Sequence, residues 1–198
     1  MSEETILMHC SPVITGLKTA NLFNYRFEDR NEVLKELKRL NHDLSGKGIR
    51  VIPLSFKKNR VLIYVYRPDY LRHDLSSVKA RDILSRCGYC VLAEVKDPVN
   101  ASLVQLMKRL SAQDEFPHEI GLFLGYPVED VEGFILNQGR NYKCCGFWKV
   151  YGNEETAKEK FQTFASCRSC CLASCRRGMT LKQLAVNGIR NEHYQPGH

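Results

Sequence analysis

The sequence contains no long hydrophobic run, no internal repeat and no low-complexity linker. No stretch approaches the roughly 18–20 consecutive apolar residues of a membrane-spanning helix. The first residues, MSEETILMHCSPV, also lack the basic and apolar segments that together form a signal peptide. We therefore expect a cytoplasmic protein that does not contact the membrane. We expect one globular domain over residues 1–186 and a frayed tail over residues 187–198.

The composition is that of an ordinary globular protein. Of the 198 residues, 43% are hydrophobic and 26% are charged, which is enough to build a buried core. The net charge is +7, and part of this excess is local, because Arg168, Arg176 and Arg177 lie in a segment without acidic residues. Such an excess permits binding to nucleic acid or to an anionic ligand but does not demonstrate either.

Hydrophobic periodicity predicts an α+β fold with about four antiparallel strands and about six to eight helices. The clearest feature is a hairpin over residues 49–66, in which Pro53 predicts an edge strand or a bulge. Other strands are expected at residues 21–27 and 141–152. Helices are expected from Ser11-Pro12, after Asp29 or Asn31, and at residues 68–75, 78–89, 97–113, 153–177 and 180–186.

Nine cysteines make thiol chemistry the first candidate function. In the cytosol they are expected to be free thiols, metal ligands or reactive groups rather than disulfides. Cys10 precedes Ser11-Pro12, and a helix beginning there would lower the pKa of its thiol. Cys10, with His9 beside it, is therefore a candidate nucleophile or a soft ligand for a metal or haem. The alternative is a buried cysteine on a small helix.

His118 is a candidate general base for Cys10. The order cysteine, histidine, then Asn141 or Asp130 resembles that of cysteine hydrolases, in which the third residue orients the imidazole. The flanking sequence matches no protease signature. The alternative is a structural histidine at the start of a helix.

An aromatic segment at residues 141–152 predicts a possible ligand wall. If it is a strand, Cys144 and Cys145 point to opposite faces. Tyr142, Cys145 and Trp148 could then line a pocket for a flat ligand, which Gly146 would allow to approach closely. The alternative is ordinary packing of an aromatic strand.

The other cysteines give weaker signals. Cys87 and Cys90 have the C-x-x-C spacing of redox or zinc motifs, but they follow a helix instead of opening one. Four more lie on one predicted helix, where Cys171 and Cys175 continue the apolar face and Cys170 points away from it. A single straight helix cannot place four sulfurs around one metal, so a complete site would require the helix to break. These four are Cys167, Cys170, Cys171 and Cys175.

Two features raise the alternative of nucleic-acid binding. Basic residues at the hairpin, interleaved with Tyr64 and Tyr66, could bind a single strand; they are Arg50, Lys57, Lys58, Arg60 and Arg67. Residues 118–136 resemble a helix-turn-helix, with Gly121 four residues before the turn glycine Gly125 and the apolar Val131 six residues after it. The second helix begins with acidic residues that would repel DNA, which makes nucleic acid an unlikely partner; they are Glu129, Asp130 and Glu132.

Two long motifs resemble an uncharacterised family of small proteins found mainly in anaerobic bacteria. They are HCSPVITGLKTANLF near the N-terminus and HEIGLFLGYPVEDVEGFILNQGRNYKCCGFWKVY in the C-terminal half. The resemblance covers residues 7–186 and implies a single-domain cytoplasmic protein, with no assigned activity or cofactor. It also suggests a redox partner such as flavodoxin. The family has alanine in place of Ser11 and lacks the CGYC and CRSCCLASC cysteines.

The sequence therefore leaves three hypotheses. The first is a thiol-containing protein that binds a ligand, metal or haem, or is linked to redox chemistry, through Cys10 and the region from His118 to Tyr151. Cys10 and Cys145 are its leading candidate metal ligands. The second is an enzyme with Cys10 as nucleophile and His118 as base. The third is a basic nucleic-acid-binding protein.

Overall fold

The structure is a computed structural model that describes residues 1–89, 97–112 and 116–188. These residues form two compact units. Among the described residues, unit 1 comprises Met1–Asp69 and residues 162–188, and unit 2 comprises Tyr70–Phe161. Each unit combines helices with a small antiparallel sheet, which confirms the predicted α+β class. The prediction of one domain over residues 1–186 stays a prediction, and residues 189–198 of the expected tail lie outside the described residues.

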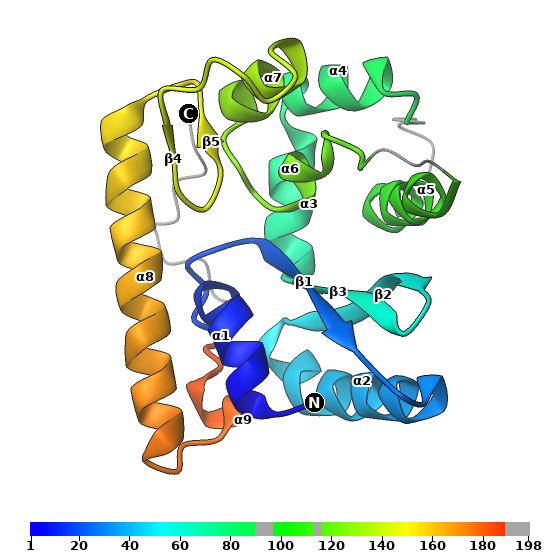
Figure 1. The fold of residues 1–198 in the computed structure, drawn as a ribbon, viewed down its shortest axis with the longest axis vertical. Coiled ribbons are helices and arrows are strands. Elements are labelled where there is room, and N and C mark those ends of the chain that lie inside the picture. The colour runs from blue at the N-terminus through cyan, green and yellow to red at the C-terminus, as the bar shows by residue number, and fades with distance from the viewer. Residues whose placement is uncertain (90–96, 113–115, 189–198) are drawn as a thin grey trace. The chain divides into compact units, whose positions relative to one another are not determined.

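Unit 1 is built on a three-stranded antiparallel sheet (Figure 1). Its strands are β1 (Ala20–Arg26), β2 (Arg50–Lys57) and β3 (Arg60–Tyr66), in the order β1-β3-β2. The predicted hairpin is thus confirmed as β2 and β3. Both expectations for Pro53 are also confirmed, because β2 is an edge strand and its register shifts between Pro53 and Ser55. An edge position suits proline, which has no N–H to donate to a neighbouring strand.

The first helix of unit 1 begins at a different residue from the one that the sequence predicted. Helix α1 spans Glu3–Ile14, so the expected helix start at Ser11-Pro12 is wrong. The Ser2 side chain caps α1 by accepting a hydrogen bond from the Thr5 N–H, and acidic residues follow in the first turn. Negative charge there is stabilised by the positive end of the helix. Pro12 falls near the end of α1 instead of at its beginning.

The rest of unit 1 follows its sequence signals. Helix α2 (Arg30–Leu44) is capped by Asp29 and buries one apolar stripe, as expected. A short 3₁₀ helix (Ser45–Lys47) follows, and α9 (Leu181–Leu184) begins at a capping box made by Thr180 and Gln183. The last part of α8 (Glu154–Arg176) also belongs to this unit.

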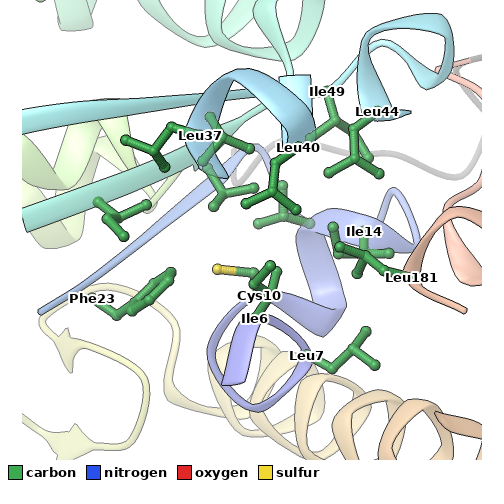
Figure 2. Close-up of a cluster of buried hydrophobic side chains, with 14 of the residues drawn as sticks. Ile6, Leu7, Cys10, Ile14, Phe23, Leu37, Leu40, Leu44, Ile49 and Leu181 are labelled. Atoms are coloured by element: carbon green, nitrogen blue, oxygen red, sulfur yellow. The ribbon is translucent and has the colours of Figure 1, made fainter. Parts of the chain in front are cut away.

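The core of unit 1 is an apolar cluster between the sheet and its helices. Figure 2 shows Cys10 of α1 pointing into this cluster, among side chains from α2, β1 and α9. The labelled members are Ile6, Leu7, Cys10, Ile14, Phe23, Leu37, Leu40, Leu44, Ile49 and Leu181.

Unit 2 is mainly helical. Its helices include α3 (Pro68–Ser76, from Tyr70 onward), α4 (Val78–Arg86), α5 (Pro98–Ala112), α6 (Ile120–Phe123), α7 (Val128–Leu136) and the first part of α8. The single strand expected at residues 141–152 is instead a hairpin of two short strands, β4 (Cys144–Cys145) and β5 (Lys149–Val150). The chain turns back at Gly146, where the hairpin meets Phe161 of α8.

Among the described residues, no helix combines the length and the apolar character needed to cross a membrane.

Candidate functional site

Cys10 does not have the environment that the sequence predicted for it. It lies in the third turn of α1, not at the helix N-terminus, and its side chain is completely buried. Burial raises the pKa of its thiol to about 12, and the nearby charge of Lys18 opposes this shift only in part. The expected low pKa is therefore wrong. A thiol with this pKa is protonated at neutral pH, whereas a nucleophilic cysteine needs its thiolate.

His9 is adjacent to Cys10 in sequence but differs from it in exposure. Its ring is exposed and lies parallel to the ring of Phe23, with 4.7 Å between the ring centres. Partial burial, and then the charge of Arg168, lowers the pKa of the imidazole. His9 thus packs on the surface of β1 while Cys10 enters the core.

Lys18 is a buried ionisable residue that sequence reasoning missed. Only 4% of it is exposed, and its ammonium donates a hydrogen bond of 2.8 Å to the Asn21 side chain. Asn21 in turn donates to the backbone carbonyl of His9. Burial lowers the pKa of Lys18 to about 7, against a smaller opposing influence from Cys10. A lysine in the loop between a helix and a strand gives no local sign of such burial.

The residues expected to orient His118 are engaged elsewhere. His118 is an exposed turn residue just before α6, and its ring meets the ring of Phe134 edge to face at 5.0 Å. Asn141 donates to the Asn137 side chain. Asp130 accepts hydrogen bonds from the β4–β5 hairpin and the residues after it. Cys10 and His118 belong to different units, and a dyad between them stays a prediction.

Asp130 organises the aromatic segment of unit 2. One carboxylate oxygen accepts from the Trp148 indole at 2.6 Å, and the other accepts from the Tyr151 and Gly152 backbone N–H groups at 2.7 Å each. The Trp148 ring stacks on Tyr126 with 5.1 Å between centres. It also meets Phe161 edge to face at 4.6 Å. The protein's own side chains therefore cover much of the surface expected to hold a flat ligand.

Gly146 serves this internal packing as well. A Cβ atom at this position would lie 2.3 Å from the ring of Phe161, so the glycine makes room for a side chain of the same chain. This corrects its expected role beside a ligand. Tyr142 and Cys145 remain exposed, with the Lys149 ammonium 4.8 Å from the centre of the Tyr142 ring.

The predicted packing of two helices across a turn at residues 118–136 is confirmed. Gly125 has a φ of 69°, which favours glycine. A Cβ atom on Gly121 would lie 2.7 Å from a methyl carbon of Val131, so α6 and α7 approach closely at this point. However, α6 is a single turn, and Asp130 at the start of α7 is buried in the contacts described above. The geometry of this motif is thus that of a structural scaffold.

The chain belongs to the DUF3793 family. The family model, described as a protein of unknown function, matches residues 6–185 and so includes both motifs on which the resemblance was based. No curated protein and no solved structure matches the chain. Membership in DUF3793 therefore assigns no activity, and the arguments for function depend on the geometry of the two units.

The four cysteines of α8 lie as the helical pattern predicted. The helix continues unbroken through all of them, with Cys171 buried and Cys170 exposed. Within residues 1–89, 97–112 and 116–188, no three or more histidine, cysteine, aspartate or glutamate side chains are grouped to hold a metal ion. Cys87 follows α4 and is half-buried. Its expected partner Cys90 lies outside the described residues, so the C-x-x-C site stays a prediction.

Fewer basic and aromatic side chains are exposed at the hairpin than the sequence predicted. Tyr64 and Tyr66 are buried and stack on each other, with 4.9 Å between ring centres. Arg67 is only 1% exposed. Its guanidinium donates to the backbone carbonyls of Val13, Ile14, Lys47 and Val186 at 2.7, 2.9, 3.2 and 3.0 Å. Arg67 is therefore a structural residue of unit 1, not a phosphate ligand.

Unit 2 contains a cleft of about 520 Å³ that the sequence did not predict. Its walls come from the end of α3, the start of α4, the turn after α6 and the start of α7. The polar side chains that line it are His73, Asp74, Ser76, Ser77, Lys79, Tyr126 and Glu129. Burial lowers the pKa of Lys160, while the negative charges of Glu129, Asp130 and Asp74 oppose this shift. Lys160 therefore lies within electrostatic reach of the two carboxylates in the cleft wall.

Proposed function

We propose that the protein binds a small metabolite that carries both an anionic and a cationic group, such as an α-amino acid, in the cleft of unit 2. The volume of the cleft carries this proposal. At about 520 Å³ it lies within the range of roughly 300–1,000 Å³ that is usual for small-molecule sites. Its mixture of apolar walls and a few charged side chains is also typical of such sites.

The start of α4 supports binding of the anionic group. Ser77 caps this helix by accepting a hydrogen bond of 3.2 Å from the Ala80 N–H, and the first turn contains no acidic residue. Unpaired N–H groups at a helix start attract negative charge. Lys79, in the same turn, adds a full positive charge to this wall of the cleft.

Negative charge lies on two other walls of the cleft. Asp74 comes from the end of α3, and Glu129 comes from the first turn of α7. The ammonium of Lys160 interacts electrostatically with both carboxylates and with Asp130. A ligand that carries both charges can place its anionic group at Lys79 and its cationic group at Glu129, which lie on different walls of the cleft.

The structure supports a role for Cys10 as a nucleophile or a metal ligand less well than it supports ligand binding in the cleft. The side chain is completely buried, and burial raises its pKa to about 12. The cleft in unit 2 has no comparable obstacle, because all of its lining residues except Leu122 are exposed or half-buried.

The fluorescence of Trp148 offers a direct test. It is the only tryptophan of the chain, and it stacks on Tyr126, which lines the cleft. The purified full chain would be titrated with the twenty standard amino acids. Each active compound would then be compared with the matching acid without the amine and the matching amine without the acid. We expect a saturable change with at least one amino acid and a much weaker response to its two analogues.

Variants of the cleft complete this experiment. Lys79→Met and Glu129→Gln should each weaken binding about tenfold or more, because a hydrogen bond to a charged group contributes about 1.5–3 kcal/mol. Lys108→Met, on an exposed position of α5, is the matched control and should bind normally. The proposal fails if no amino acid gives a saturable change, or if both cleft variants bind as tightly as the control.

A further inference from the structure

Two thiols of α8 lie against each other in unit 1. Cys167 and Cys171 are one helical turn apart, and the two thiols share a hydrogen bond. The Thr15 hydroxyl, from the end of α1, lies 3.1 Å from the Cys167 sulfur. Cys171 is 5% exposed and packs in the core cluster, while Cys167 is half-buried at its edge. The pair is thus held in place by α1 and the core and is open on one side.

The spacing of this pair does not suit a disulfide. Side chains four residues apart on a helix have Cβ atoms about 5–6 Å from each other. A disulfide needs Cβ atoms about 3.5–4.5 Å apart, so forming one would distort α8. Two thiolates that share one metal ion can be further apart, since each metal–sulfur bond is about 2.3 Å long and a linear arrangement separates the sulfurs by roughly 4–5 Å.

The number of available ligands limits which ion would fit. Structural zinc requires four ligands in a tetrahedron. Cys175 lies about 12 Å further along the helix axis than Cys167, which is too far for a shared ion, and Cys170 is exposed on a different side. Monovalent copper is a soft ion that prefers thiolates and accepts two of them in a linear arrangement.

We infer that Cys167 and Cys171 form a two-coordinate site for monovalent copper on α8. Binding converts two thiols and one Cu⁺ into a dithiolate complex with a net charge of −1, and two protons pass to the solvent. No electron is transferred. Arg168 follows Cys167 directly, and the segment from Cys167 to Arg177 contains three arginines and no acidic residue. Arg176 is paired with Glu4, so the positive charge that stabilises an anionic complex comes mainly from Arg168, next to Cys167 in sequence.

The test is a copper competition experiment on the reduced full chain without oxygen. Monovalent copper would be supplied as its coloured complex with bicinchoninate, and loss of colour would report transfer to the protein. We expect one equivalent to be transferred to the natural sequence. X-ray absorption of the product should show two sulfur ligands at one distance.

Cysteine variants identify which thiols bind the copper. Cys167→Ser should weaken copper binding by about 100-fold or more, because even changes outside the ligand set of a metal typically cost 10–100-fold. Cys145→Ser, at an exposed position of β4 in unit 2, is the control and should bind as the natural sequence does. Circular dichroism of both variants verifies the fold, and Cys167 is preferred to Cys171 as the test position because it is less buried.

Three results would overturn the inference. The first is failure of the natural sequence to take copper from bicinchoninate. The second is unchanged binding in a folded Cys167→Ser variant. The third is loss of binding in Cys145→Ser, which would place the copper at the neighbouring thiols of β4.

Discussion

The indole N–H of Trp148 donates a hydrogen bond of 2.6 Å to the Asp130 carboxylate, and both residues are buried. The same carboxylate receives two backbone N–H groups from Tyr151 and Gly152. One acidic residue at the start of α7 thereby fixes the β4–β5 hairpin and the following loop. The long motif from His118 to Tyr151 is explained in large part by this internal architecture.

Replacing Asp130 with asparagine should destabilise unit 2. The amide has one oxygen in place of two, so at least one of the three donors would be left without its acceptor, at a cost of roughly 1–3 kcal/mol for each lost partner. Urea unfolding followed by Trp148 fluorescence measures the effect. Glu132→Gln, which removes a partly exposed ion pair with Arg86, is the control and should change stability by less than about 1 kcal/mol. Equal stability of the two variants would contradict this account of Asp130.

Gly146→Ala should also be destabilising, by about 1–3 kcal/mol, because the new methyl group would overlap the ring of Phe161 and force the two to separate. Thermal unfolding of the variant measures this cost. Gly46→Ala offers a matched comparison, since a Cβ atom there meets nothing within 4 Å. If both substitutions lower the melting temperature equally, the close approach of Gly146 to Phe161 is not the cause.

Lys18 and Cys10 should give the stability of the protein a defined dependence on pH. The folded pKa of Lys18, about 7, lies below its ordinary value of about 10.5. Between these values the unfolded chain binds the extra proton, so stability rises with pH. Cys10 has a folded pKa of about 12, above its ordinary 9.0, so it lowers stability as pH rises above 9. The two effects on stability oppose each other above pH 9. The free energy of unfolding is therefore expected to rise with pH only between about pH 7 and 9.

Urea unfolding at pH 7, 8 and 9 tests this dependence. The contribution of Lys18 has a slope of at most about 1.4 kcal/mol per pH unit. Lys18→Met should remove that slope, whereas Lys108→Met should leave it unchanged. If the stability of the natural protein and of Lys18→Met depends on pH in the same way, Lys18 is not buried in its neutral form.

The rate at which each cysteine of the folded protein is alkylated should follow the exposure of its side chain. At neutral pH, iodoacetamide should modify Cys145 and Cys170 first, because both are exposed. Cys10 and Cys171 should react only after unfolding, since both are buried. Peptide mapping by mass spectrometry gives the order. Rapid labelling of Cys10 in the folded state would restore it as a candidate nucleophile.

Much of the fold follows from signals within a few residues of each other. Asp29 and the spacing of Val33, Leu37 and Leu44 predict α2, and Pro53 predicts both the edge position and the irregularity of β2. The beginning of α1 has a local signal as well, in Ser2 and the acidic residues after it. Ser11-Pro12 gives an equally good local signal for a helix start. The buried apolar face that runs from Ile6 to Ile14 is what favours the start after Ser2.

The candidate site could not be predicted in the same way. Asp74 and Glu129 are more than fifty positions apart in sequence and face one cleft because α3, α4 and α7 pack in a particular arrangement. The burial of Lys18 likewise depends on contacts that no local pattern encodes. The aromatic character of Trp148 is visible in the sequence, but its packing partners Tyr126, Asp130 and Phe161 lie at least 13 positions away along the chain.

The four carbonyl acceptors of Arg67 have a consequence for biosynthesis. They come from residues 13–14, residue 47 and residue 186, and the last of these is translated after residues 70–161 of unit 2. A nascent chain that has reached only Asp69 still lacks one of the oxygens that hold the buried guanidinium. The arginine of the first-made segment of unit 1 therefore gains its last backbone acceptor only after residue 186 has been synthesised.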